Sequence, residues 1–185
     1  ADDGSSLREM FLADRAAWES QLGALFSDPD ASPAPDDVAA TAATTRAHLG
    51  FASETSTWVT ARGEAELVVP GVVWREAVLL LEASPVSSVD DLFSSSSRPL
   101  GEVTQDGKPF DRSLPKLVSE IFAAEDHPEW VMVLAGQWVL LTQRDRWAEG
   151  RYLAVDLLLA VQRAHVRKGG ELDRVLAILG RDSLL

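Results

Sequence analysis

The sequence predicts a mixed α/β domain, in which a central mixed sheet carries a β-hairpin and is flanked by helices. Apolar residues recur at helical spacing within the first fifty residues and again after residue 156. Runs of aliphatic and β-branched residues, separated by glycine and proline, fill the middle of the chain. Residues 130–142 place two apolar runs around a short turn that contains Gly136, which is the pattern of a hairpin.

Length and composition fit one globular unit. The chain has 185 residues, of which 46% are hydrophobic and 25% charged, so a core can form without a disulfide or metal scaffold. We expect a helical lead-in at residues 1–50 and an α/β domain at residues 51–185, packed together. The absence of cysteine fits a reducing compartment. Since no apolar run approaches the roughly 20 residues of a membrane span and no signal peptide is visible, a cytoplasmic protein without membrane contact is expected.

The lead-in contains two predicted helices. The first spans residues 7–26 and places its apolar side chains mostly three and four positions apart: Leu7, Met10, Phe11, Trp18, Leu22, Leu25 and Phe26. A proline-rich linker at residues 28–35 ends it, because proline cannot continue the hydrogen-bond ladder. The second helix is expected at residues 38–49, with Asp36 or Asp37 as its cap and Gly50 at its C-terminal end.

Three strands of the sheet are predicted next. They lie at residues 58–60, 67–69 and 77–81, with Gly63, Pro70 and Gly71 between them. The third is almost continuously apolar, which is typical of a central strand covered on both faces. Residues 84–110 are rich in serine, glycine and proline, and this pattern predicts a surface excursion outside the core.

The last third of the chain completes the predicted sheet. A helix is expected at residues 114–124, with Pro115 in its first turn. The hairpin strands at 130–134 and 138–142 follow, and a third strand lies at 152–155 beyond a charged link at 143–151. Two helices, at about 156–167 and 171–179, close the chain.

The charge of the chain argues against tight DNA binding on its own. Seventeen basic and 29 acidic residues give a net charge of −12, which repels the phosphate backbone. Basic residues nevertheless gather near the C-terminus. The segment at 144–152 interleaves three arginines with two aromatic side chains, which can contact phosphates and stack on bases: Arg144, Arg146, Trp147, Arg151 and Tyr152. The alternative, which the total charge favours, is an ordinary link in which Trp147 covers the sheet and the arginines pair with acidic neighbours.

A candidate catalytic carboxylate is Glu82, which follows the apolar strand at 77–81. Many metal-dependent nucleases hold Mg²⁺ at such a position, together with a second carboxylate and a lysine two residues after one of them. Glu64 and Glu66 are the candidate partners, but the lysine position is occupied by Ser84. A strand-end glutamate without catalytic role is therefore the competing interpretation.

Other catalytic patterns are weak or absent. Only residues 106–108 form an acidic-x-lysine triplet, and an Asp-Gly turn explains this segment better than a catalytic role. His48, His127 and His165 lack the spacing of a metal site. The chain has no nucleophile-elbow, phosphate-loop or dinucleotide-binding motif.

Two segments carry a resemblance to a known family. Residues 127–141, HPEWVMVLAGQWVLL, are followed at 146–157 by RWAEGRYLAVDL. Together they resemble the N-terminal region of large bacterial adenine-specific DNA methyltransferases of the Eco57I type, in which a Pro-x-Trp strand, a hairpin, a tryptophan link and an RYL-x-x-DL junction occur in this order. Residues 47–51 and the strand that leads to Glu82 also look similar, so the resemblance covers about residues 47–185.

The resemblance implies a fold like that of PD-(D/E)xK restriction endonucleases, in a protein of restriction-modification or phage defence. It also implies that this chain is a fragment, with a methyltransferase domain that binds S-adenosylmethionine beyond Leu185. We therefore expect a catalytically inactive N-terminal domain that serves DNA positioning or assembly. Two alternatives stay open: an active Mg²⁺-dependent nuclease that uses Glu82 with Glu64 or Glu66, and a protein-interaction module without a nucleic-acid role.

Overall fold

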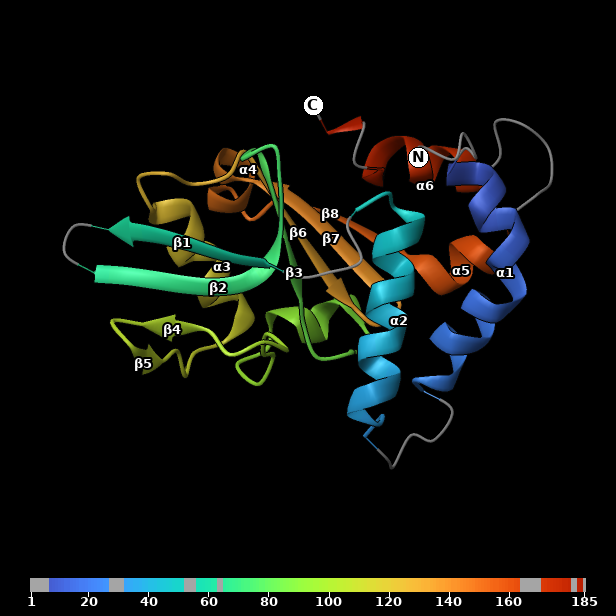
Figure 1. Cartoon of the computed structure of the whole chain (residues 1–185), viewed down its shortest axis with the longest axis horizontal. Coiled ribbons are helices and arrows are strands. Elements are labelled where there is room, and N and C mark those ends of the chain that lie inside the picture. The colour runs from blue at the N-terminus through green and yellow to red at the C-terminus, as the bar shows by residue number, and fades with distance from the viewer. Residues whose placement is uncertain are drawn as a thin grey trace.

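The computed structural model describes residues 7–26, 32–51, 56–62, 65–163, 171–180 and 183–184. It confirms the mixed α/β class: a central mixed sheet is flanked by helices (Figure 1). The strands are β1 (Ser56–Arg62), β2 (Ala65–Trp74), β3 (Val78–Glu82), β4 (Thr104–Gln105), β5 (Lys108–Pro109), β6 (Trp130–Ala135), β7 (Trp138–Gln143) and β8 (Leu153–Asp156). The helices are α1 (Leu7–Ala24), α2 (Pro35–His48), the 3₁₀ helix η1 (Val89–Phe93), α3 (Leu114–Ala123), α4 (Arg144–Ala148), α5 (Leu157–Gln162) and α6 (Glu171–Leu179). None of these described helices has the length and apolar character of a membrane span.

The eight strands form one sheet in the order β5-β4-β2-β3-β6-β7-β8, and β1 pairs with β2. At its centre β3 and β6 are parallel, whereas β6, β7 and β8 form an antiparallel meander. The predicted hairpin is thus confirmed as β6 and β7. Its turn contains Gly136, whose φ of +65° lies in the left-handed region that favours glycine.

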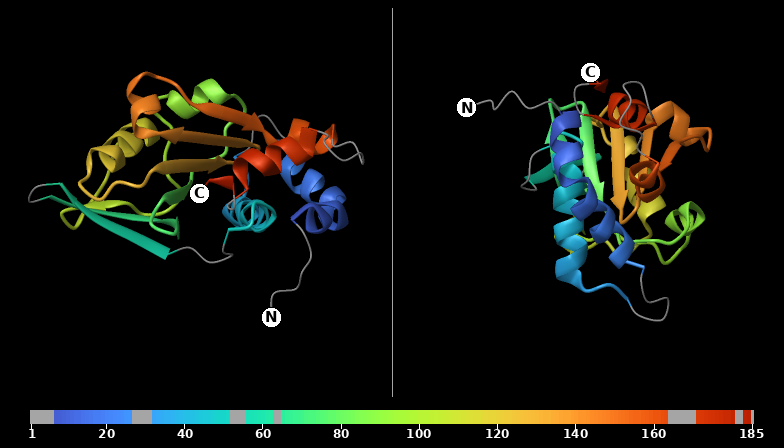
Figure 2. Two further views of the ribbon diagram at one scale, coloured as in Figure 1. Left: turned by 90° about the horizontal axis from the view of Figure 1, so that it is seen from above. Right: turned by 90° about the vertical axis from the view of Figure 1, so that its right-hand side faces the viewer.

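Alternate residues of the central strands face two separate cores. On one face, Val78 and Leu80 of β3 pack with α1, α5 and α6, while on the other Leu79 and Leu81 pack with η1 and α3. Figure 2 shows the sheet between these two layers of helices. This double cover explains the uninterrupted apolar sequence of β3, and it confirms the prediction of a central strand.

The lead-in helices belong to the first of these cores. Trp18 and Leu22 of α1 are buried against the sheet, and the Trp18 indole Nε1 donates a hydrogen bond to Thr45 Oγ1 of α2 at 3.0 Å. The predicted start of α2 was wrong, because the helix begins at Pro35 and Ala34 is its N-cap. Proline fits the first helical position, since a backbone N–H there would have no partner within the helix and its absence costs nothing. Of the predicted linker, residues 28–31 lie outside the described part of the chain.

The predicted break at Pro70 was also wrong, since β2 continues through it. Pro70 lies opposite Thr57 of β1, and from Val72 onward β2 pairs with β3 instead. The missing N–H of proline is tolerated at this change of partner. Gly71 is needed beside it, because a Cβ there would lie 2.5 Å from the carbonyl oxygen of Leu80.

The segment after β3 contributes to the core, which corrects the prediction of a surface excursion. Leu92, Val103 and Phe110 are buried in the core that includes α3. Leu92 lies in the short helix η1, whereas Val103 and Phe110 are separated by polar, glycine and proline residues. The segment therefore lacks the continuous apolar pattern that would have identified it as part of the core. The predicted Asp-Gly turn is confirmed: Asp106 and Gly107 both have positive φ between β4 and β5.

Candidate functional site

The register of the sheet defines two opposite ends, and each carries a group of candidate residues. Glu82 lies opposite Leu134 near the carboxyl ends of the parallel strands β3 and β6, and we call this the Glu82 end. Gln143 lies opposite Trp130, where β6 begins and β7 ends. The candidate DNA-binding residues follow directly after Gln143, and we call this region the basic end.

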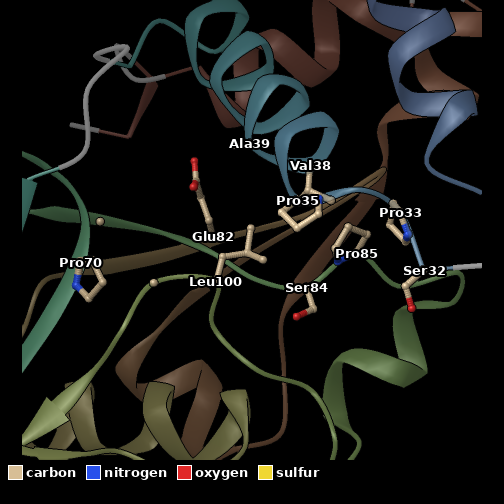
Figure 3. Close-up of a pocket in the computed structure, with 12 residues that line it drawn as sticks. Ser32, Pro33, Pro35, Val38, Ala39, Pro70, Glu82, Ser84, Pro85 and Leu100 are labelled. Atoms are coloured by element: carbon tan, nitrogen blue, oxygen red, sulfur yellow. The ribbon is translucent and has the colours of Figure 1, made fainter.

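A cavity of about 510 Å³ opens at the Glu82 end. Its walls come from the start of α2, the bend of β2 and the segment after β3, and they include Pro35, Val38, Pro70, Ser84 and Leu100. Figure 3 shows the Glu82 side chain rising from β3 on the side of α2. The cavity lies beyond the carboxyl end of a parallel strand, which is where α/β proteins commonly bind ligands.

The Glu82 carboxylate is engaged by an arginine from the lead-in. Glu82 Oε1 forms an ion pair with Nη1 of Arg46, in the last turn of α2. The side chains are 6% exposed for Arg46 and 17% for Glu82, so the pair is largely shielded from water. Burial lowers the pKa of the Arg46 guanidinium from its ordinary value. Because arginine stays charged even so, the carboxylate is the group that compensates a buried cation.

The surroundings of Arg46 are polar but packed. The His48 ring lies against Trp18, with 4.6 Å between the ring centroids. Burial lowers the pKa of His48, and the nearby Asp14 acts in the opposite direction. His48 is therefore neutral near pH 7 and packs as an aromatic ring. This layer of Trp18, Arg46 and His48 attaches the lead-in to the sheet.

Among the residues that the structure describes, the candidate partner Glu66 does not lie beside Glu82. The register that places Val72 opposite Leu80 puts Pro70 level with Glu82, so Glu66 is four residues further along β2, about 13 Å away at strand spacing. The Glu66 side chain is exposed, and its backbone N–H donates to Asp106 Oδ1 at 2.9 Å. Glu64 lies outside the described residues.

The described residues do not fit a Mg²⁺ site around Glu82. The ion needs several oxygen ligands, and nucleases usually supply two carboxylates. In the described part of the chain, no group of three or more histidine and carboxylate side chains is arranged to hold a metal ion. Ser84, at the position of the expected lysine, contributes a neutral hydroxyl to the cavity wall.

At the basic end, the three candidate arginines are exposed, and two of them are partly neutralised by a glutamate. Arg146 and Arg151 both approach Oε2 of Glu149, at 3.7 and 3.2 Å. Arg144 Nη1 lies 3.0 Å from His127 Nε2, and His127 Nδ1 lies 3.0 Å from the carbonyl oxygen of Pro128. These contacts fit a neutral His127 that accepts from Arg144 and donates to Pro128.

Trp147 has a structural role at this end. Its Nε1 donates to Ser119 Oγ of α3 at 3.0 Å, and its ring stacks on Phe93 with 6.0 Å between centroids. The half-buried indole packs against the core that includes α3. Stacking on a base would require these contacts to break. The arrangement matches the alternative in which Trp147 covers the sheet and neighbouring charges pair.

The two ends are too far apart to form one site. Along β6, Leu134 opposite Glu82 is four residues from Trp130, which corresponds to about 13 Å. Glu82 and the arginines of the basic end therefore cannot act on the same phosphate. Sequence reasoning missed Arg46, because no spacing links it to Glu82 and most neighbours in α2 are alanine and threonine.

Comparisons of the chain with protein-family models, with curated proteins and with solved structures find no match.

Proposed function

We propose that this chain is a non-cleaving, nuclease-like domain of a DNA restriction-modification methyltransferase, in which it serves DNA positioning or assembly. The observation that carries the proposal is the ion pair of Glu82 with Arg46, which uses the candidate metal ligand to fix α2 on the sheet. The sequence resemblance at residues 127–157 supplies the family. Adenine methylation with S-adenosylmethionine then belongs to a separate methyltransferase domain, which is C-terminal in that family.

The energetics of the ion pair support a structural role for Glu82. A metal ion that captured this carboxylate would leave the Arg46 guanidinium buried without its partner, and breaking such a pair costs about 3–5 kcal/mol. Catalytic carboxylates of nucleases face the ion together with further acidic groups instead. Glu82 therefore stabilises the junction between the lead-in and the sheet.

A protein-interaction module without a nucleic-acid role is the second candidate, and the basic end favours it. Glu149 offsets part of the charge of Arg146 and Arg151, and Trp147 is engaged by Ser119. The net charge of −12 opposes contact with DNA over the whole surface. Under this candidate, the exposed arginines recognise acidic groups of a protein.

Incubation with plasmid DNA tests the absence of cleavage. We expect the purified chain to leave supercoiled plasmid intact in the presence of either Mg²⁺ or Mn²⁺. Metal-dependent cutting that is lost in Glu82→Gln would contradict the proposal and identify an active nuclease. Glu82→Gln can also disturb the fold. Glu66→Gln therefore provides a second test, because Glu66 is the other described candidate ligand and its side chain is exposed. Circular dichroism verifies that both variants are folded.

Fluorescence anisotropy with a labelled DNA duplex separates the two candidate roles. Binding through the basic end would weaken steeply between about 50 and 200 mM salt. It would also be lost in an Arg144→Glu, Arg146→Glu, Arg151→Glu triple variant, and this result would support DNA positioning. Undetectable binding at low salt would favour the interaction module. Arg112→Glu is the matched control, since Arg112 is also exposed and paired but precedes α3.

A further inference from the structure

We infer that a groove at the basic end, between β8 and α6, is a docking site for an extended, acidic segment of a partner protein. Its walls are Trp130, Tyr152, Leu153 and Ile178, and Arg146 and Arg151 lie on it as well. The inference deepens the assembly role of the proposed function and rests on that role. It does not depend on DNA binding or on cleavage.

The first observation is a concentration of exposed apolar surface. Tyr152, Leu153 and Ile178 are 40%, 38% and 46% exposed, and they make up half of the exposed large hydrophobic residues in the described part of the chain. All three line this one groove, whose volume is about 510 Å³. Scattered apolar residues on a surface need no explanation, but a contiguous group around a groove marks a site of interaction.

The second observation is the position of β8 at the margin of the sheet. β7 pairs with one side of β8, and no described strand pairs with the other. The backbone there can accept an added strand, as in β-augmentation. Leu153 lies opposite Leu141, so a residue paired with Leu153 from the free side would place its own side chain beside Leu153 in the groove.

The third observation is charge, which selects the kind of segment. Among the described residues, Arg146 and Arg151 share a single carboxylate, Glu149, so two guanidinium groups face one negative charge. In a chain with 29 acidic residues, the described lining of this groove thus carries two guanidinium groups and no carboxylate. A carboxylate on the bound segment could form a bidentate pair with a guanidinium, whereas a basic segment would be repelled.

Nucleic acid fits this groove less well than polypeptide does. Proteins bind single-stranded nucleic acid chiefly by stacking its bases on aromatic side chains. Of the aromatic side chains in its wall, Tyr152 already packs on Phe93, with 4.7 Å between the ring centroids, and Trp130 packs half-buried against the core. The walls at Leu153 and Ile178 are aliphatic and offer no face for stacking. An aliphatic side chain of a partner packs against both, and the free margin of β8 recognises peptide backbone.

Selection from a displayed library of random peptides tests the inference. We expect the chain to enrich sequences that alternate aliphatic residues with aspartate or glutamate. A synthetic fluorescent copy of an enriched peptide should lose at least about tenfold in affinity on Ile178→Asp and on Arg151→Glu. Arg112→Glu, an exposed arginine outside the groove, should bind it as the parent chain does. Circular dichroism and urea unfolding establish that the variants are folded.

Several results would overturn the inference. The library could enrich no acidic-aliphatic sequence, or the enriched peptide could bind both groove variants unchanged. Displacement of the peptide by single-stranded oligothymidylate would assign the groove to nucleic acid, and self-association lost on Ile178→Asp would assign it to a second copy. Peptide binding without any cleavage or duplex binding would leave the inference intact, so its failure is distinguishable from failure of the DNA role.

Discussion

The two ends of the sheet use the same residue types in opposite ways. At the Glu82 end, one arginine and one glutamate are withdrawn from water and hold a helix to a strand. At the basic end, Arg146, Arg151 and Glu149 are each more than half exposed. A buried pair is costly to break, whereas an exposed pair contributes little to stability and remains able to exchange partners. Burial, rather than residue identity, therefore separates structural charge from charge that is available for recognition.

The largest expected effect comes from removing one member of the buried pair. Arg46→Met leaves the Glu82 carboxylate in the cavity wall without its positively charged partner. We expect the free energy of unfolding to fall by about 3 kcal/mol. The double variant Arg46→Met, Glu82→Met should recover much of this loss, because it removes both charges. Urea unfolding measures the free energy of unfolding of the parent chain, the single variant and the double variant. A loss below about 1 kcal/mol for Arg46→Met would remove the energetic contrast between the ends.

A glycine at each end allows a second comparison. Gly136 and Gly150 both have positive φ, at +65° and +71°, so alanine should cost about 1 kcal/mol of backbone strain at either position. At Gly136 a Cβ would also lie 2.9 Å from Cβ of Pro85, whereas nothing lies within 4 Å at Gly150. We expect Gly136→Ala to lose about 2 kcal/mol, and Gly150→Ala about half of that. Equal losses would show that the Glu82 end repacks as freely as the basic end.

The buried histidine predicts a pH dependence for the Glu82 end. Because burial holds the pKa of His48 below its ordinary value of about 6.5, the unfolded chain binds more protons than the folded chain below that pH. The free energy of unfolding should therefore fall as the pH falls through 6.5 toward the folded-state pKa. His48→Phe should flatten this slope between about pH 5.5 and 7.5, where ordinary carboxylates stay ionised. Unchanged slopes in the variant would count against the predicted role of His48.

The smallest expected effect is at the basic end. Glu149→Ala removes both exposed pairs, and the free energy of unfolding should change by at most about 0.5 kcal/mol. The same variant should bind the acidic peptide of the proposed groove more tightly, since two guanidinium groups are released. Thermal unfolding and peptide anisotropy provide the two measurements. A large destabilisation would mean that these charges are structural, as they are at the Glu82 end.

Periodic patterns predicted much of the fold correctly. The two apolar runs around a glycine turn that define β6 and β7, the continuous apolar run of β3 and the helical spacing of α3 each follow from local rules. The predictions that were wrong concern residues whose structure depends on partners distant in the chain. Pro70 stays within β2 because that strand changes neighbours, and Leu92, Val103 and Phe110 reach the core from a segment without a continuous apolar pattern.

The candidate sites were less predictable than the fold. Glu82 could be singled out from its place after an apolar strand, but its partner could not, because α2 approaches β3 only through tertiary packing. The charged residues of the basic end could be located from their positions in the sequence alone. Their pairing with Glu149 agrees with one of the two alternatives that the sequence leaves open, whereas the groove beside them requires α6 to approach β8.

The parallel pairing of β3 with β6 has a kinetic consequence. The hairpin of β6 and β7 needs only a short turn, whereas β3 can join β6 only after the whole segment from Ala83 to Glu129 has been traversed. Closing such a long loop costs entropy before the contacts form, and distant pairings slow folding. The meander of β6, β7 and β8 should thus form early and act as the template. The strand that bears Glu82 would be added later, together with the helix that supplies Arg46.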